Sequence, residues 1–308
     1  MHYRLSAGKP LQEAVPAIAA DQLDAAIARL KSADHDHTAV HSARKHFKRA
    51  RALLGLVAPA ARGNKIKASQ KLIASAARML ASSRDAQIAI AAAEALTKDF
   101  GAGRNARTFS DLTSFLVARR DRVEEKLSHA GLEPVLKELE KAKRSLSKLD
   151  LRGMKMGDLL ESACATYRQG RHSMKDALDS GAGEAVHDWR KLAQRHWRHM
   201  LLLKDAWPKE AKARIALARR LSGILGQHND LAVMREIILT NRIVFRSPSD
   251  VRMLCRCVEK KQEELISEAA SLGERLYAEK RKAFAKRLDA HWHSAKNKRP
   301  AAEARAPA

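Results

Sequence analysis

Two stretches of the chain begin with a histidine and continue with arginine and lysine at helical spacing. His41 opens the first stretch and His187 the second, and an Arg-Lys pair follows each three and four positions later. The basic residues are Arg44, Lys45, Lys48, Arg49 and Arg51 in the first stretch, and Arg190, Lys191, Arg195 and Arg198 in the second. Guanidinium and ammonium groups bind phosphate oxygens, and an imidazole can donate a hydrogen bond to phosphate or gain a proton near neutral pH. These residues indicate the binding of a phosphate-rich anion.

The basic residues of each stretch share one face of the helix that they predict. At 100° per residue, the basic residues of the first stretch lie within about 80° of its histidine, and those of the second stretch repeat the pattern. Phe47 and Leu54 in the first copy, and Trp189 and Ala193 in the second, lie largely on the other side. A solvated helix face normally mixes charge signs, because like charges one turn apart repel by about 0.2–0.5 kcal/mol per pair. The unmixed faces therefore indicate that a bound polyanion supplies the missing negative charge.

The basic character extends beyond the two histidine stretches. No Asp or Glu occurs between His37 and Arg84. Further candidate residues for the site are Lys67, Lys71, Arg78, Arg219 and Arg220. The alternative interpretation of all these charges is a generally basic surface without a defined site.

Composition restricts the fold and the partner. The 308 residues include 59 Lys and Arg against 35 Asp and Glu, a formal charge of +24, and aromatic residues make up 4%. A chain rich in Ala, Leu, Lys, Arg and Glu favours helices, so we expect an all-α protein. Its three cysteines, Cys164, Cys255 and Cys257, do not form a disulfide framework, which favours a cytoplasmic location. The longest uncharged run, 52–61, is too short for a membrane span, so no membrane partner is expected.

An internal repeat organises the sequence. Residues 40–45 match residues 186–191 at an offset of 146, and residues 79–85 match residues 224–230 at an offset of 145. We therefore expect a duplicated helical unit, with one copy over about 8–150 and the other over about 151–295.

Gly and Pro residues mark the expected breaks between helices, and Gly223 with Gly226 is one of these breaks. An amphipathic helix is expected over about 250–291. From Ser294 onward the composition is typical of a frayed end, and 296–308 are expected to form a basic disordered tail.

The paired His-x-x-Arg-Lys helices, each followed by a helix with an Arg-Asp or Asn-Asp step, resemble the conserved histidine α-helical domain (CHAD) family. The resemblance covers about residues 8–295 and implies a single domain over 1–295, built as two pseudo-symmetric four-helix bundles with a basic cleft or pore between them. It also implies binding of inorganic polyphosphate and association with polyphosphate granules. The family's histidine maps to His41 and His187. Gln194 replaces the counterpart of Lys48, and Leu80-Ala81 replaces the Leu-Gly step of Leu225-Gly226.

Two classes of binding protein follow from these observations. The first binds polyphosphate without catalysis, because a bare phosphate chain needs Arg and Lys but no stacking aromatics. The alternative is a nucleic-acid-binding protein that contacts the phosphate backbone, with nucleic acid otherwise expected only as a weaker competitor. Proteins that bind single strands place aromatic rings among the basic groups. Here Phe47, Trp189 and Trp197 are expected to lie away from the basic centre.

An enzyme acting on polyphosphate or a triphosphate is a third class. The sequence has neither a Gly-rich phosphate loop nor an evident set of metal-binding carboxylates. Residues 138–142 approach the Glu-x-Glu-x-Lys signature of triphosphate-tunnel domains, with the lysine one place early, and are expected to form a surface helix. His35-Asp36-His37 and His291-Trp292-His293 are not expected to bind metal. No catalytic residue, metal or cofactor is therefore expected.

Overall fold

The protein is helical throughout the part described by the computed structural model, which comprises residues 3–6, 8–32 and 37–303. The main helices in chain order are α1 (Leu11–Lys31), α2 (His37–Val57), α3 (Lys65–Met79), α4 (Ala81–Phe100), α5 (Ala106–Ala130), α6 (Glu133–Leu146), α7 (Met156–Ser180), α8 (Gly183–Leu203), α9 (Pro208–Thr240), α10 (Pro248–Leu276) and α11 (Arg281–Glu303). Three short 3₁₀ helices, Gly103–Asn105, Lys204–Ala206 and Arg242–Val244, join some of them. The described residues contain no β-strand, which confirms the prediction of an all-α fold.

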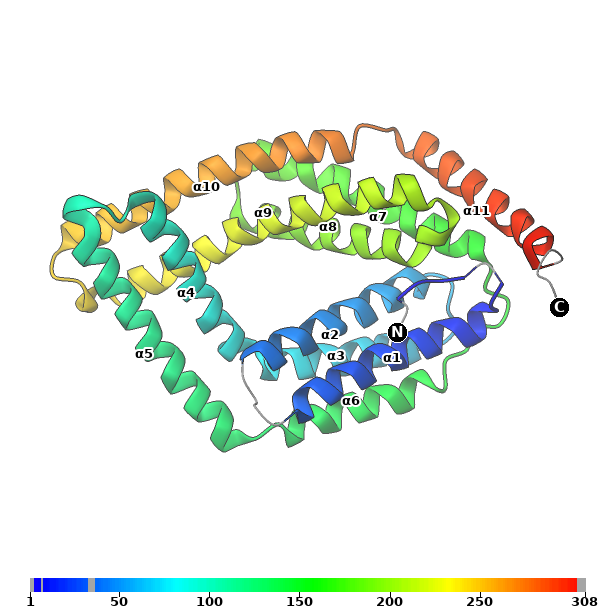
Figure 1. The fold of residues 1–308 in the computed structure, drawn as a ribbon, viewed down its shortest axis with the longest axis horizontal. Helices are drawn as coiled ribbons and strands as arrows, with labels where there is room; N and C mark the ends of the chain where they lie inside the picture. The colour runs from blue at the N-terminus through cyan, green and yellow to red at the C-terminus, as the bar shows by residue number, and fades with distance from the viewer. Residues whose placement is uncertain (1–2, 7, 33–36, 304–308) are drawn as a thin grey trace.

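The first bundle consists of α1, α2, α3 and α6 (Figure 1). α1 packs along α2, and α3 packs along α6. Phe47, Ala50 and Leu54 of α2 are fully buried in the core, as their position opposite the basic face predicts. The apolar side of α2 thus fixes the direction in which its basic side points.

The second bundle consists of α7, α8, α9 and α10, and α11 packs on α7 at its end (Figure 1). α8 matches α2 in length, since both have 21 residues and their first residues are 146 positions apart. His41 and His187 are consequently the fifth residues of their helices. The two-bundle architecture is as predicted, while the origin of the halves by duplication stays a prediction.

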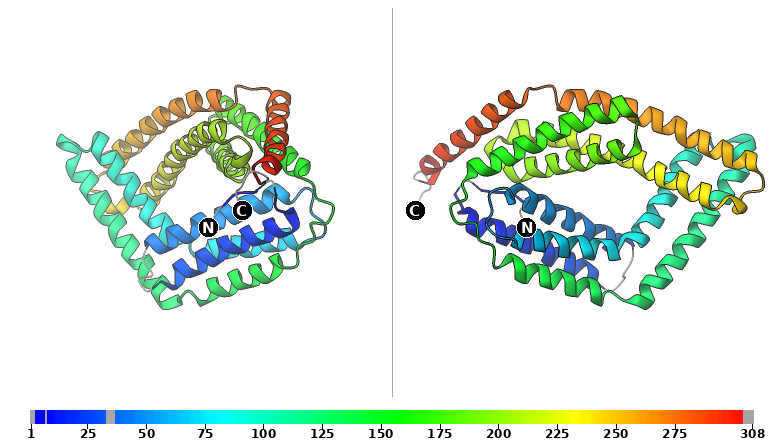
Figure 2. Two further views of the ribbon diagram at one scale, coloured as in Figure 1. Left: turned by 45° about the vertical axis from the view of Figure 1, so that its right-hand side comes forward. Right: turned by 180° about the vertical axis from the view of Figure 1, so that it is seen from behind.

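A helical hairpin of α4 and α5 leaves the first bundle and crosses to the second (Figure 2). It packs against the distal parts of α9 and α10, where Leu112, Leu116, Met234 and Leu254 belong to a second hydrophobic core. The bundles also meet directly, because α2 contacts α7 and α8. These two connections hold the basic faces of α2 and α8 at a shared boundary.

Some predicted helix limits are wrong. α9 continues through Gly223 and Gly226, where a break was expected, because packing along α8 and α10 outweighs the cost of about 1 kcal/mol for a glycine within a helix. The single helix expected over 250–291 is divided into α10 and α11. The division follows Leu276, where the ring of Tyr277 is buried 5.4 Å from that of Tyr167.

The end of the chain also differs from the prediction. α11 continues to Glu303, through residues 296–303 that were expected to be a disordered tail. Residues 304–308 of that predicted tail lie outside the described residues. Within the described ranges, no helix combines the length and the apolarity needed to cross a membrane.

Candidate anion-binding site

A cavity of about 300 Å³ lies where α2 and α8 meet. Its lining residues come from α2, α3 and α8, and they are Lys48, Arg51, Ala52, Gly55, Gln70, Lys191, Gln194, Arg195 and Arg198. Five of the nine are Lys or Arg, and none is Asp, Glu or His. The cavity therefore provides a basic cleft between the two bundles.

Lys48 is the centre of the charges around this cavity. Four arginines lie close enough to repel its ammonium group, namely Arg44 of α2, Arg84 of α4, and Arg190 and Arg198 of α8. Burial of the ammonium group, followed by repulsion from these four guanidinium groups, lowers the pKa of Lys48 to about 7. We call these five residues the Lys48 cluster. A bound anion would relieve the repulsion and favour the protonated lysine.

The Lys48 cluster has few counter-ions. Its two ion pairs are Arg84–Asp85 at 3.7 Å and Arg190–Asp230 at 3.8 Å. The other three members have no carboxylate within 4.0 Å among the residues that the structure describes. Three of its arginines, Arg44, Arg190 and Arg198, have a buried Nε that finds no hydrogen-bond partner among the described residues. Buried positive charges without counter-ions lower the stability of the folded protein. A bound polyanion would restore part of that stability.

Exposed basic residues form the rim of the cavity: Arg51, Lys191 and Arg195. Partial burial of its guanidinium group and then the charge of Arg195 lower the pKa of Arg51, so these two guanidinium groups are neighbours across the boundary between α2 and α8. Lys191 contacts Asp188 at 2.8 Å, but both side chains are more than half exposed, and such a pair is weak. A ligand in the cavity can thus reach solvent-exposed cations as well as the desolvated cluster.

Backbone contacts hold the cluster in position. Arg44 Nη1 donates to the carbonyl oxygen of Ala77 on α3, and Arg198 Nη1 donates to that of Gln194 at 2.8 Å. His199 is fully buried, and its Nε2 donates to the carbonyl oxygen of Ala52 at 3.1 Å, which joins α8 to α2. Groups held in this way lose little further conformational freedom when a ligand binds.

The two histidines that open the motif are exposed and favour the neutral form. Partial burial of the imidazole rings and then the nearby lysine and arginine charges lower the pKa values of His41 and His187. Asn229 Nδ2 donates to His187 Nδ1 at 2.6 Å, which leaves His187 Nε2–H as a donor. In the first half, Arg84 occupies the position that corresponds to Asn229 in the repeat. Its positive charge helps to lower the pKa of His41. Neutral imidazoles of this kind can donate to phosphate oxygens.

The remaining predicted site residues are more dispersed. Arg78 lies near Arg51, since its charge contributes to the lowered pKa of that arginine. Lys45 lies near His41 and contributes in the same way to the lowered pKa of that histidine. Arg49 is directed to the N-terminal segment, where its guanidinium carbon lies 5.7 Å from the centre of the Tyr3 ring.

Four candidates have no contact that places them at the cavity. Arg220 pairs with Glu268 of α10 at 2.8 Å. Lys67, Lys71 and Arg219 are exposed and absent from the cavity lining. Their solvated positions fit a general contribution to the basic surface and no specific role at the cavity.

Sequence reasoning missed several residues that shape the site. Arg84 and Asp230 belong to the Arg-Asp and Asn-Asp steps of the repeat, and the sequence pattern alone does not assign these steps to the site. Gly226 is a third. A Cβ at this position would lie 3.0 Å from Nη2 and 3.3 Å from Cζ of Arg190, so the glycine admits the guanidinium group.

We expect Gly226→Ala to displace Arg190 and to weaken anion binding at this site, with tripolyphosphate as the probe, by about threefold to tenfold. Gly223→Ala is the matched control, because a Cβ there meets nothing within 4 Å. The control should bind as the wild type does and gain up to about 1 kcal/mol in helix stability. Equal affinities of the two variants, measured by calorimetry, would show that Arg190 is not required at its present position.

Two predictions about the aromatic residues have different outcomes. Phe47 and Trp189 are buried in the core, away from the cavity, as expected. The expectation for Trp197 is wrong, because its ring lies 4.1 Å from the guanidinium carbon of Arg198. Attraction between a cation and an aromatic face accounts for this contact. Trp197 does not itself line the cavity.

The segment that approaches the triphosphate-tunnel signature lies in α6, as expected for a surface helix. Leu139 is fully buried there, and Lys141 pairs with Glu138 at 3.0 Å. The described residues contain no group of three or more His, Cys, Asp or Glu side chains that could hold a metal ion. His35 and Asp36 lie outside those residues.

A known protein family matches most of the chain. The family model of the CHAD domain matches residues 17–239, which is more than half of the protein. The chain belongs to the CHAD domain family. The Lys48 cluster, the cavity and the motif histidines all lie within the matched residues. No curated protein matches this CHAD protein in sequence.

Two solved structures have a similar fold. PptA from Streptomyces chartreusis has a TM-score of 0.64 and 14% sequence identity, over 88% of this chain and 100% of that chain. The CHAD domain from the plant Ricinus communis has a TM-score of 0.60 and 16% identity, over 94% of each chain. At these identities the likeness establishes the shared fold alone.

Proposed function

We propose that this CHAD protein binds inorganic polyphosphate at the cavity between α2 and α8. The observation that carries the proposal is Lys48, which is surrounded by four arginines and opens into a cavity without acidic lining residues. The family's link to polyphosphate-related proteins supports the same ligand. Association with polyphosphate granules in the cytoplasm is part of this proposal.

The lining of the cavity favours a bare phosphate chain over a nucleic acid. It contains no aromatic side chain on which a base could stack, and its uncharged members are Ala52, Gly55, Gln70 and Gln194. Closely spaced arginines can each grip two phosphate oxygens, while a lysine acts as a point charge. A chain that is charged at every unit fits such a lining in many registers.

We further propose that the protein acts by binding and not by catalysis. Hydrolysis of a phosphoanhydride commonly uses carboxylates to hold a metal ion or to orient water. The cavity lining has no Asp, Glu or His, and the two carboxylates next to the Lys48 cluster are in ion pairs with its arginines. The arrangement supports retention of the anion.

Titration with fluorescently labelled long-chain polyphosphate at several salt concentrations tests the proposal. The Lys48 cluster and the three rim residues offer eight cations, so we expect the logarithm of the association constant to fall with the logarithm of salt concentration with a slope of about −5. A slope near −1, or no binding at physiological salt, would rule out a multidentate phosphate site.

A further inference from the structure

A second basic pocket lies at the tip of the molecule, where the 3₁₀ helix Arg242–Val244 joins α9 to α10. It measures about 540 Å³. Its lining lies within residues 235–259 and shares no residue with the cavity between α2 and α8. The tip is formed by the distal ends of α9 and α10, which pack on the α4–α5 hairpin (Figure 1). The pocket is thus separate from the proposed polyphosphate site.

Five arginines surround this tip pocket, and a single acidic residue accompanies them in its lining. The arginines are Arg235, Arg242, Arg246, Arg252 and Arg256, and the acid is Glu259. Arg235 pairs with Glu259 at 3.1 Å, and Arg246 pairs with Asp111 of α5 at 3.3 Å. Arg252 and Arg256 are exposed and have no ion pair among the described residues. The pocket therefore has free positive charge for an anionic group.

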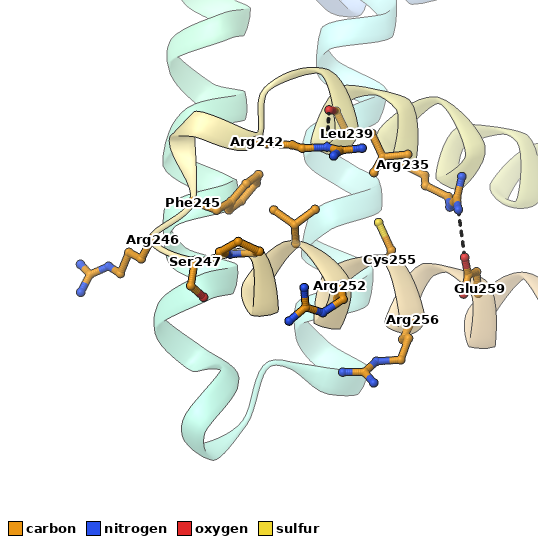
Figure 3. A pocket seen from close by; sticks show the side chains of 12 residues that line it. Arg235, Leu239, Arg242, Phe245, Arg246, Ser247, Arg252, Cys255, Arg256 and Glu259 are labelled. Carbon is orange, nitrogen blue, oxygen red and sulfur yellow. Dashed lines mark hydrogen bonds and ion pairs between the residues drawn. The ribbon is translucent and has the colours of Figure 1, made fainter.

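The inner surface of the tip pocket is more apolar than that of the central cavity. Leu239, Phe245, Val251 and Cys255 contribute to the lining. Figure 3 shows Phe245 and Cys255 directed into the space between the end of α9 and α10, with Arg242 at its edge beside Leu239, whose carbonyl oxygen accepts a hydrogen bond from Arg242 Nε. An apolar floor with a few charged groups at its edge is typical of sites for small organic ligands, and 540 Å³ lies in their usual size range.

We propose that the tip pocket binds a small organic anion, whose apolar body contacts Leu239 and Phe245 and whose phosphate or carboxylate group pairs with Arg252 and Arg256. A bare phosphate chain would leave the apolar floor unused. A neutral apolar molecule would leave the arginines without partners. An anion with an apolar body satisfies both features of the pocket.

The test uses the full chain and the fluorescent aromatic sulfonate 8-anilinonaphthalene-1-sulfonate as its probe. We expect one probe to bind per chain, and Arg252→Glu/Arg256→Glu to weaken its binding by at least about tenfold. Phenyl phosphate should displace the probe at a concentration at least about tenfold lower than inorganic phosphate, because the two share a phosphate group and differ in the apolar ring. Displacement by both at the same concentration would overturn the proposal.

Three further variants make the result specific. Leu239→Gln keeps every charge and should still weaken probe binding, which tests the apolar floor if the double variant fails to fold. Arg168→Glu/Arg171→Glu, at exposed positions of α7, makes the same charge change elsewhere and should leave probe binding within about twofold. Arg51→Glu/Arg195→Glu, at the central cavity, should also leave probe binding within about twofold. If all three double variants weaken the probe equally, the arginines act only as diffuse positive charge and the tip pocket is no site.

This inference stands apart from the proposed function. Arg252→Glu/Arg256→Glu should bind polyphosphate within about twofold of the wild type, since the tip pocket is separate from the central cavity. Loss of probe binding alone supports the tip pocket, whereas loss of polyphosphate binding in this variant would show that the phosphate chain uses the tip as well and would count against a dedicated organic-anion site.

Discussion

Charge reversal at the rim of the central cavity, Arg51→Glu/Arg195→Glu, is expected to weaken polyphosphate binding by at least about 100-fold. Each guanidinium group that contacts phosphate contributes about 1.5 kcal/mol or more, and the two contributions combine in one site. Both residues line the cavity, are exposed, and make no ion pair among the described residues. The protein should therefore fold normally, and a titration with labelled polyphosphate measures the loss.

The matched control for this variant is Arg168→Glu/Arg171→Glu, which makes the same change of charge at exposed positions of α7. We expect it to alter the affinity by no more than about threefold, through the long-range field alone. Circular dichroism verifies that both variants keep their helices. Equal losses in the two variants would mean that net charge, and not the cavity, determines binding.

Replacement of Lys48 is expected to move stability and affinity in opposite directions. Lys48→Met removes an ammonium group that is desolvated and repelled by four arginines, so the free energy of unfolding at pH 7 should rise by about 1–2 kcal/mol, after allowance for partial solvent screening. The same change removes a cation from the site and should weaken polyphosphate binding by about tenfold. Thermal unfolding and binding titration measure the two effects.

The pH dependence of this effect follows from the lowered pKa. Between pH 7 and 10.5 an unfolded lysine holds a proton that folded Lys48 has released, so a rise in pH stabilises the folded wild type relative to the unfolded chain. The stability advantage of Lys48→Met should therefore be greatest at pH 7 and below, and should disappear by about pH 10.5. Unfolding by denaturant at several pH values measures this difference in the free energy of unfolding between the variant and the wild type.

Binding of polyphosphate should raise the lowered pKa of Lys48. At pH 8.5 the wild type is expected to take up close to one proton when polyphosphate binds, and Lys48→Met close to none. Calorimetry in two buffers of different ionisation enthalpy counts these protons. Lys282→Met on α11, where the lysine is exposed, is the control and should behave as the wild type. If Lys48→Met destabilised the protein and left binding unchanged, Lys48 would have a structural role only.

The helical fold and much of the site could be predicted from the sequence, because both depend on local periodicity. The spacing of Phe47 and Leu54 against Arg44 and Lys48 separates a buried side of α2 from a charged side, and the structure confirms that separation. The repeat then predicts the same arrangement around Arg190 in α8.

The remaining features depend on contacts that a single sequence does not show. Arg84 reaches the Lys48 cluster because the first turn of α4 begins beside α2 and α3. Gly226 was expected to end a helix, whereas its missing side chain makes room for Arg190. Arg49 lies next to Lys48 in the sequence but contacts Tyr3 instead, since the N-terminal segment packs beside it. Each depends on how distant segments pack.

A competition experiment at physiological salt tests most directly whether the central cavity is specific for a bare phosphate chain. Labelled long-chain polyphosphate bound to the wild-type protein is challenged with duplex DNA and with single-stranded RNA at equal phosphate concentration. We expect neither nucleic acid to displace the polyphosphate, because the cavity lining holds closely spaced cations and no stacking aromatic. Ready displacement by DNA or RNA, with a salt slope indicating as many phosphate contacts, would contradict this account and would assign the basic faces to nucleic-acid binding.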